Sequence, residues 1–525
     1  MRSFSFILLV LCVHFLNAQE KHNFSVHDML AMDRISNNQV SPDGRQIAFV
    51  LRKTDLEANK GRTDIWVVDA DGKNLKQLTT DPAGDIEPLW SVDGQVLYFL
   101  SSRSGTYQVW KMNRDGSQPV QVTKLPLPVS NLAISPDGLH LAFSMEVFPD
   151  CVDLQCSVNR LEEIKNQKSS GIIFDHLFIR HWDTWNDNRR SHVFTMPITG
   201  GDVVDVMQQM DADCPSKPFG GAEEFTFTPD SKGIVFTAKD VGRTEAWSTD
   251  FDLYYVPLDG SEKPRCLTDE NKAWDTQPLF SPDGKTMAYL AMSRPGFEAD
   301  RYRIVLYSWE NAKKRVLTES WDRSPSSFVW SADSKTLYVS ADNLGQKSLF
   351  AIDAASAKVN MLHKMGTVRS PQVFKNRIFF GMDHLQSPVE LYSIKTDGSD
   401  LKQITRINAE KMAKVRTGEP EQFTFKGWND ETVYGYVVKP VDFDPTKKYP
   451  VAFLIHGGPQ GSFGNDFHYR WNPQAYAGAG YAAVMVDFHG SVGYGQDFTD
   501  AIRGDWGGKP LVDLQKGLAA ALEKY

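Results

Sequence analysis

Short hydrophobic strands separated by polar turns recur along residues 36 to 408. One signature is a hydrophobic strand, then Ser-Pro-Asp-Gly or a relative of it, then a second hydrophobic strand. Proline sets φ for the second turn position, Asp bonds back to the backbone and Gly takes the positive φ, so each copy predicts a hairpin. Six copies lie at residues 41–44, 91–94, 135–138, 228–230, 281–284 and 331–333, and a degenerate seventh lies at 373–376.

A second signature follows each first one: an aromatic-rich strand, a polar turn and another strand. Its copies begin at Asp64, Tyr107, His192, Asp252, Arg303, Lys347 and Val389. Most copies are about 43 to 53 residues apart, the period of propeller blades, and together they make seven four-stranded units. The sequence therefore predicts an all-β seven-bladed propeller over residues 19–408. One step of 93 residues, from Ser135 to Thr228, indicates an insertion at about 146–190.

After Arg406 the pattern of hydrophobic residues no longer predicts propeller strands. Residues 432–438 alternate like a strand, and residues 451–455 form a continuous apolar run, as expected of a buried parallel strand. A second such run, 482–486, follows, and an amphipathic helix is expected over about 511–524. Strand, glycine loop, strand, glycine loop and helix is the opening of an α/β domain, here 409–525.

The N-terminus has the features of a secretory signal. Arg2 is followed by an apolar stretch at 4–16 and by a small residue, Ala18, before the chain turns polar. We expect residues 1–18 to be a signal peptide and the protein to be secreted or periplasmic. In an oxidising compartment Cys151, Cys156, Cys214 and Cys266 can form one or two disulfides. A disulfide between Cys151 and Cys156 would cross-link a polar loop of the chain.

Composition and charge exclude several classes of partner. The 525 residues carry 57 basic and 66 acidic side chains, a net charge of −9, which argues against a general grip on nucleic acid phosphates. No segment beyond the N-terminus approaches the roughly 18 apolar residues of a spanning helix. No histidine pair has the spacing of metal ligands, so we expect neither a metal nor another cofactor. The sequence leaves a homodimer open.

The first glycine loop of the C-terminal segment contains the first candidate for a catalytic role. It reads His456-Gly457-Gly458-Pro459 and directly follows the apolar run 451–455. Consecutive glycines let bare backbone approach a ligand, with N–H groups free to point at an oxyanion. In α/β-hydrolases the loop after the third strand donates one of the two oxyanion-hole N–H groups. We predict that the Gly458 N–H has this role.

The whole arrangement resembles the prolyl oligopeptidase family of serine peptidases, a β-propeller followed by an α/β-hydrolase domain. The resemblance depends on the hairpin repeats, on the loop at Gly458 and on two further motifs, 490–495 (Gly-Ser-Val-Gly-Tyr-Gly) and 505–508 (Asp-Trp-Gly-Gly). The form of the loop is similar to that of the dipeptidyl peptidase V and acylaminoacyl peptidase branch. The resemblance implies a Ser-Asp-His triad, an acyl-enzyme and cleavage of short peptides near their N-termini, with the propeller excluding folded proteins.

The chain departs from this family in one respect. It contains no Gly-x-Ser-x-Gly, the motif that carries the nucleophile. Ser491 and Ser462 have glycines at the wrong distance and are simply read as loop residues. In the family the nucleophile, the acid and the histidine follow the helix that here ends near Tyr525. We therefore expect a truncated hydrolase domain in this chain, without the triad and without turnover of its own.

Substrate binding needs carboxylates that pair with a free α-ammonium group. Glu223 and Glu224 stand just before an inner strand of a predicted blade, near one mouth of the channel, and are our candidates. Glu162 and Glu163, in the insertion, are a second pair, and solvated surface carboxylates are the alternative for both. Two functions remain open: an exported serine peptidase acting on short peptides, and a propeller that serves only as a binding scaffold with a vestigial hydrolase segment.

Overall fold

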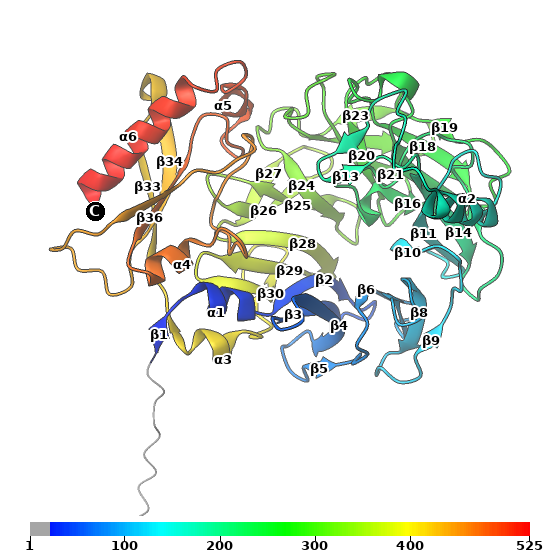
Figure 1. Ribbon diagram of the computed structural model, residues 1–525, viewed down its shortest axis with the longest axis horizontal. Helices are drawn as coiled ribbons and strands as arrows, with labels where there is room; N and C mark the ends of the chain where they lie inside the picture. Colours follow the sequence, from blue (N-terminus) through cyan, green and yellow to red (C-terminus); the bar gives the residue numbers. More distant parts are fainter. Residues whose placement is uncertain (1–20) are drawn as a thin grey trace, which may run out of the picture.

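The computed structural model describes residues 21–525, so the expected signal peptide, 1–18, lies outside the described residues. The chain from residue 34 to residue 403 is a β-propeller of antiparallel sheets around a common centre (Figure 1). Among the described residues it has five separate four-stranded sheets and one eight-stranded sheet. The eight-stranded sheet consists of two four-stranded groups, joined only by the parallel pairing of Lys347 with Thr367.

Each sheet runs outward from an inner strand, and the strands follow one another in chain order. The first two sheets are β2 (Arg34–Val40), β3 (Gln46–Asp55), β4 (Lys60–Asp69), β5 (Lys76–Gln77) and β6 (Asp85–Trp90), β7 (Val96–Ser101), β8 (Gln108–Asn113), β9 (Val120–Gln121). The next three are β10 (Ser130–Ile134), β11 (His140–Val147), β14 (Arg190–Pro197), β15 (Val204–Asp205); β16 (Phe225–Phe227), β17 (Gly233–Ala238), β18 (Asp252–Pro257), β19 (Arg265–Cys266); and β20 (Asp275–Phe280), β21 (Thr286–Ala291), β22 (Arg303–Ser308), β23 (Lys314–Val316). The eight-stranded sheet holds β24 (Pro325–Trp330), β25 (Thr336–Asp342), β26 (Lys347–Asp353), β27 (Val359–His363), β28 (Thr367–Phe374), β29 (Arg377–His384), β30 (Ser387–Lys395) and β31 (Lys402–Gln403).

In six of the groups the turn between the first two strands has the chemistry expected from the sequence, whereas in the degenerate seventh Lys375 takes a positive φ of 52° without such a serine–aspartate pair. In the first copy Ser41 Oγ donates to Asp43 Oδ1 at 2.6 Å and accepts from Gln46 N at 3.0 Å, and Gly44 has φ 70°. Where the glycine is missing, Ser231 and Ser334 take the positive φ instead. The hairpin predictions are confirmed, because the serine and aspartate oxygens hold the turn even without glycine.

Neighbouring sheets are joined mainly by apolar packing, with a few side-chain hydrogen bonds along the inner strands. The indole of Trp90 donates to Gln39 O of the preceding inner strand at 3.1 Å, and Glu87 accepts from Leu132 N of the next at 2.9 Å. The ring closes between the last inner strand and the first, where Gln372 accepts from Val40 N at 2.7 Å. Residues of β3 and β29, such as Phe49 and Phe379, share one buried cluster at this closure.

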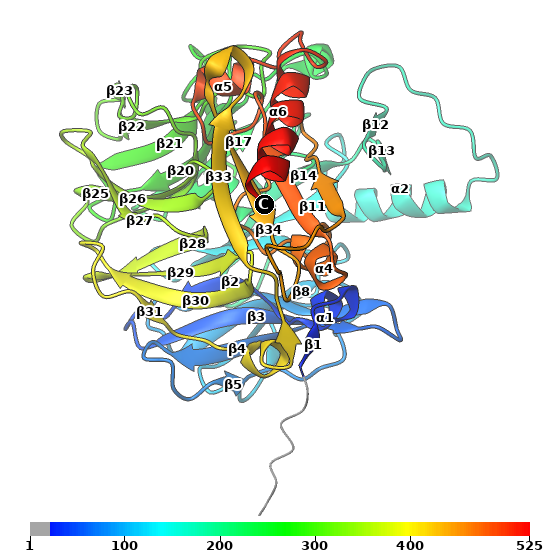
Figure 2. The same ribbon diagram turned by 90° about the vertical axis from the view of Figure 1, so that its left-hand side faces the viewer.

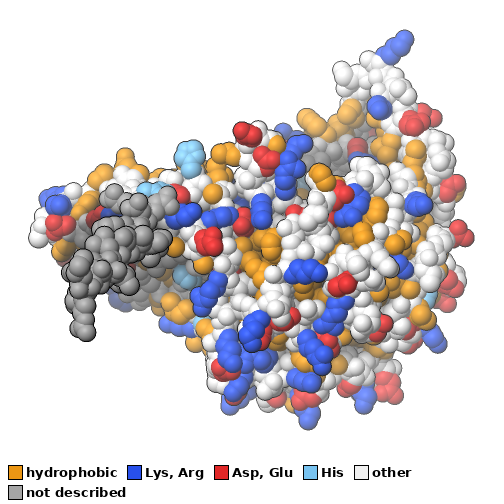
Figure 3. All heavy atoms as spheres, turned by 90° about the horizontal axis from the view of Figure 1, so that it is seen from below, with side chains coloured by type: hydrophobic (Ala, Val, Ile, Leu, Met, Phe, Trp, Pro, Cys, Tyr) orange, Lys and Arg blue, Asp and Glu red, His pale blue; other side chains and the backbone are white. Residues whose placement is uncertain are grey.

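An arm projects from the connection between β11 and β14 (Figure 2). It contains α2 (Leu154–Asn166) and a small hairpin, β12 (Arg180–His181) and β13 (Thr184–Trp185). At its base Cys151 and Cys156 form a disulfide, as the sequence suggested, whereas Cys214 and Cys266 are free thiols. Seen from below, an arm stands clear of the rest of the molecule, with apolar side chains gathered beside it (Figure 3).

The C-terminal segment forms a mixed four-stranded sheet in the order β33 (Pro420–Lys426), β34 (Thr432–Val438), β36 (Ala482–Asp487), β35 (Val451–Leu454). Only β35 and β36 are parallel. The parallel strand expected at 451–455 is confirmed as β35, which pairs with β36. It is less buried than a strand with neighbours on both sides, because it is the edge strand of the described sheet: its residues are half-buried and Ile455 is 53% exposed. Around the sheet lie η3 (Trp428–Asp430), α4 (Pro473–Gly478), α5 (Gln496–Asp500) and α6 (Lys509–Lys524).

The first described residues pack against the beginning and middle of the C-terminal segment. Strand β1 (His22–Asn23), which precedes α1 (Val26–Ala31), pairs in parallel with β32 (Val415–Arg416), just after α3 (Ala409–Met412). Phe24 packs edge-on against Phe467 with ring centroids 6.0 Å apart. The first described residues therefore belong with the C-terminal segment. None of the helices described has the length and apolar character to cross a membrane.

Candidate functional site

The His-Gly-Gly loop leaves the end of β35 and presents Gly458 to solvent. Gly458 has φ 128°, and a Cβ placed there would lie 2.7 Å from Gln460 N. Both facts require glycine at this position. The Gly458 N–H donates no hydrogen bond to any residue that the structure describes. An exposed and unused backbone donor on a strained turn is what an oxyanion site needs.

The His456 side chain holds the His-Gly-Gly loop in place. Its Nδ1 is 2.8 Å from Gly457 O, and its ring stacks on Phe488 with centroids 4.4 Å apart. A carbonyl oxygen only accepts, so Nδ1 carries a proton, and Nε2 lies 2.8 Å from Ser491 Oγ, within hydrogen-bond distance. His456 thus ties the His-Gly-Gly loop to the second glycine loop, residues 490–495.

Asp487, at the end of β36, holds the same two loops from the other side. Ser462 Oγ donates to it at 2.5 Å and the Tyr494 hydroxyl at 2.6 Å. Burial raises the pKa of the Asp487 carboxyl, and the nearby His456 opposes this. Sequence reasoning missed His456 and Asp487 as supports. The available signal was their position, each directly after an apolar strand run.

The Ser491–His456 pair is not an accessible nucleophile and base. Ser491 is fully buried, and no substrate carbonyl can reach its hydroxyl without opening both loops. The Ser462 hydroxyl already donates its hydrogen bond to Asp487. Both serines act as loop residues in this structure.

The propeller supports the second glycine loop directly. Leu344, in the turn between β25 and β26, donates its N–H to Gly493 O at 3.0 Å. A Cβ on Gly493 would lie 3.1 Å from the carbonyl carbon of Asp342, so this turn fits against bare backbone. Arg294 binds Asp500 of α5 at 2.5 and 2.9 Å. The loops that frame Gly458 therefore depend on how the two regions dock.

The candidate glutamates lie in η1 (Ala222–Glu224), directly before the inner strand β16. They differ in environment: Glu223 is exposed, whereas Glu224 is 5% exposed. Glu224 accepts from Ser216 N at 2.6 Å and from Ser216 Oγ at 2.7 Å. Burial raises the pKa of Glu224 to about 7, with a further contribution from the charge of Glu223.

Glu223 and Glu224 lie on the face of the propeller that contacts the C-terminal segment. Two other inner strands show which side this is. Thr367, at the start of β28, donates to Asn465 O at 3.0 Å, and Arg34, at the start of β2, lies 4.2 Å from the ring centre of Tyr469. Because η1 precedes β16 in the same way, the two glutamates lie at this mouth, whereas Glu162 and Glu163 are on the exposed side of α2.

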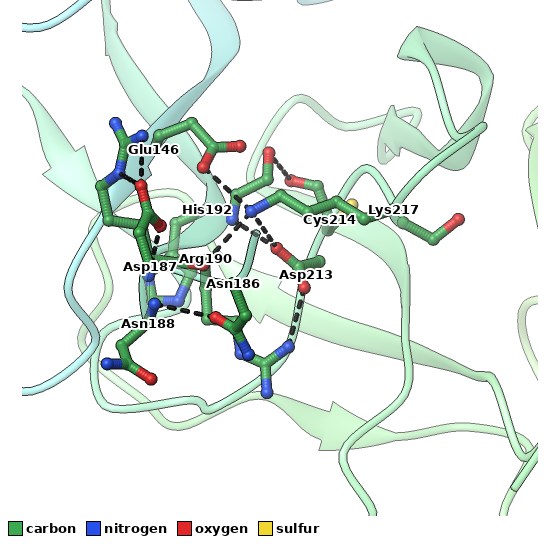
Figure 4. Close-up of polar contacts among 12 residues, drawn as sticks. Glu146, Asn186, Asp187, Asn188, Arg190, His192, Asp213, Cys214 and Lys217 are labelled. Carbon is green, nitrogen blue, oxygen red and sulfur yellow. Dashed lines mark hydrogen bonds and ion pairs between the residues drawn. The ribbon is translucent and has the colours of Figure 1, made fainter. Parts of the chain in front are cut away.

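The base of the arm is clamped to the loop that carries Ser216 (Figure 4). Arg190, at the start of β14, donates to Asp211, Asp213 and Glu245 at 2.7 to 2.9 Å. Lys217 Nζ binds Glu146, at the end of β11, at 2.9 Å. The described residues contain no group of His, Cys, Asp and Glu side chains arranged to hold a metal ion.

Comparison with known proteins agrees with this architecture. Residues 16–169 match the model of the TolB beta propeller domain, and residues 467–525 match that of the prolyl oligopeptidase family. Dipeptidyl-peptidase 5 of Trichophyton schoenleinii is 34% identical over 528 residues, which cover 94% of this chain and 71% of the relative. The chain belongs to the prolyl oligopeptidase family.

Two further proteins resemble this chain, one in sequence and one in fold. Dipeptidyl-peptidase 5 of Porphyromonas gingivalis is 27% identical, covering 92% of this chain and 70% of its own length. The acylaminoacyl peptidase of Pyrococcus horikoshii shares the fold with a TM-score of 0.75 at 19% identity, over 95% of this chain and 72% of its own. Prolyl oligopeptidase family members of this kind are serine peptidases, so the enzyme class expected from the sequence is confirmed.

Proposed function

We propose that this protein is an exported serine peptidase that removes dipeptides from the free N-termini of short peptides through an acyl-enzyme. Membership of a serine peptidase family and relatives named dipeptidyl-peptidase 5 support the reaction. The observation that carries the site is the free N–H of Gly458 on a strained, exposed turn. In this proposal it donates to the oxyanion of the tetrahedral intermediate.

The remaining parts of the proposal follow from the same arrangement. The four-stranded groups form one seven-bladed propeller over residues up to 408, with the arm as an insertion at about 146–190. Residues 409–525 are part of an α/β-hydrolase domain. Since Ser491 is buried and no Gly-x-Ser-x-Gly occurs, the attacking serine and its triad partners are not among these residues. Glu223 and Glu224 bind the substrate ammonium group.

The experiment uses the complete protein and two peptides that differ only by N-acetylation, with products identified by mass spectrometry. Release of a dipeptide from the free peptide alone supports the proposal. Release of an N-acetylated amino acid from the blocked peptide would instead assign the protein to the acylaminoacyl type. No cleavage of either peptide would favour the scaffold alternative, against which the exposed Gly458 N–H argues, because a scaffold has no use for an oxyanion donor.

A further inference from the structure

Exposed aromatic side chains gather where the arm meets the glutamate loop. Trp182, at the tip of the β12–β13 hairpin, is 73% exposed, and Phe219 is 74% exposed. Their rings meet edge to face with centroids 5.3 Å apart. Large aromatic rings left this open, and in contact with each other across two separate segments, mark a binding surface more often than a structural core.

Phe219 directly precedes the two glycines that lie against the candidate carboxylates. A Cβ on Gly220 would be 2.5 Å from Glu224 Oε2, and one on Gly221 would be 2.6 Å from Glu223 Oε2. Gly220 Cα is therefore roughly 4 Å from the Glu224 carboxylate, and Phe219 Cα is about 3.8 Å further along the chain. An ammonium group held by these carboxylates would place the side chain of its own residue beside Phe219 and Trp182.

The arm is fixed relative to the glutamates. Lys217, two residues before Phe219, reaches back to Glu146 at one end of the arm and to Arg189 O at the other. The neighbouring Ser216 holds Glu224. The same short loop thus holds the Glu224 carboxylate and the root of the arm, and it carries the exposed phenyl ring. The contact of Lys217 with the root of the arm is drawn in Figure 4.

The arm also projects toward the side on which the C-terminal segment docks. It occupies the connection between the second and third strands of its sheet. In the β24 group the corresponding connection contains Leu344, which donates to Gly493. The Trp182–Phe219 surface is therefore on the same mouth of the propeller as the loops that frame Gly458.

We propose that Trp182 and Phe219 form a subsite for the side chain of the substrate's first residue and make the enzyme prefer peptides that begin with a large apolar residue. The occupant is a short peptide with a free N-terminus, because exposed apolar rings adjoin acidic groups that complement an ammonium ion. This inference rests on the proposed function and adds the substrate class.

The test measures kcat/KM of the complete protein for dipeptide reporters that share the second residue and begin with Phe, Leu or Gly. In the wild type we expect the Phe- and Leu-initial reporters to be preferred over the Gly-initial one by about tenfold or more, the effect of burying one apolar side chain. The double variant Trp182→Ala/Phe219→Ala should reduce this ratio to near unity. It should leave the melting temperature almost unchanged, since both side chains are exposed.

Two further variants separate specificity from structure. Trp182→Phe keeps an aromatic ring and should retain most of the preference. Leu139→Ala removes a side chain that is 60% exposed in the same sheet but on the turn at the other end of the strands, and should change nothing. An unchanged Phe-to-Gly ratio in the double variant would overturn the subsite while cleavage of the Gly-initial reporter leaves the peptidase function intact. A change of sedimentation mass with an unchanged ratio would assign the surface to contact between two copies, and also overturn it.

Discussion

Two loops that open on the same side of the molecule are held in different ways. The glutamate loop, residues 219–224, is held by a residue close to it in sequence. Ser216, eight residues before Glu224, donates its N–H and its hydroxyl to the Glu224 carboxylate. The His-Gly-Gly loop is fixed from a distance, by Ser491 thirty-five residues away and, through residues 490–495, by Leu344 of the propeller. The glutamate loop is thus a local structure, whereas the His-Gly-Gly loop depends on how the two regions dock.

The largest effect on stability should come from a variant that weakens the contact between the propeller and the C-terminal segment. Arg369 of β28 binds Asp383 at 3.0 and 3.1 Å and Asp466 of the C-terminal segment at 2.7 Å. Arg369→Ala leaves the buried Asp383 without its cation and should destabilise the complete protein by about 3 kcal/mol in urea unfolding. The control is Arg62→Ala, which removes an exposed ion pair with Asp55 and should have almost no effect. Equal effects of the two variants would show that docking does not depend on this cluster.

Gly458→Ala should nearly abolish turnover without unfolding the protein. The new Cβ would lie 2.7 Å from Gln460 N at a φ of 128°, so the turn must rotate its N–H away. We expect kcat to fall by about 100-fold. Gly457→Ala is the matched control, because a Cβ there meets nothing within 4 Å. A Gly458→Ala enzyme with normal kcat would remove this amide from the mechanism.

Glu224 should make the propeller less stable as the pH rises. Its pKa in the folded protein is about 7, above the ordinary 4.5, so the folded state binds the proton more tightly. Its contribution to stability is complete below about pH 4.5 and is lost as the pH rises through about 7. The fall in melting temperature between about pH 5 and pH 8 should be smaller in Glu224→Gln than in the wild type. Identical pH profiles of the two proteins would contradict this.

Glu223→Gln should have the smallest effect and should act on binding alone. Glu223 is exposed and makes no hydrogen bond to another described residue. Removing its charge should lower kcat/KM for a peptide with a free N-terminus by about tenfold, through KM, and leave stability unchanged. An N-acetylated peptide serves as the control substrate. A loss confined to kcat would count against ammonium binding.

The local parts of the fold could be predicted from the sequence, and the long-range parts could not. A turn such as 41–44 encodes its own hydrogen bonds, so its hairpin is visible in four residues. Strand β34 also appeared at its predicted bounds, Thr432–Val438. Strand β35 also forms as a parallel strand, but its place at the edge of the described sheet is a long-range property, because an apolar run does not reveal how many neighbours a strand has.

The candidate site shows the same division. The glycine requirement at Gly458 follows from the turn itself, but its support by His456, Ser491 and Asp487 is created by folding. Similarly, the pair Glu223–Glu224 is visible as a pair, yet nothing in the sequence shows that one is exposed and the other is held by Ser216. The contact of Trp182 with Phe219 joins segments thirty-seven residues apart and has no local signal.

We propose that the two glycine loops serve a serine peptidase whose nucleophile is neither Ser491 nor Ser462. Labelling the complete protein with a fluorophosphonate probe, followed by mapping of the modified peptide, tests it most directly. We expect a single labelled serine within a Gly-x-Ser-x-Gly sequence, a motif that these 525 residues do not contain. Labelling of Ser491 or Ser462, or no labelling of a folded and complete protein, would contradict it.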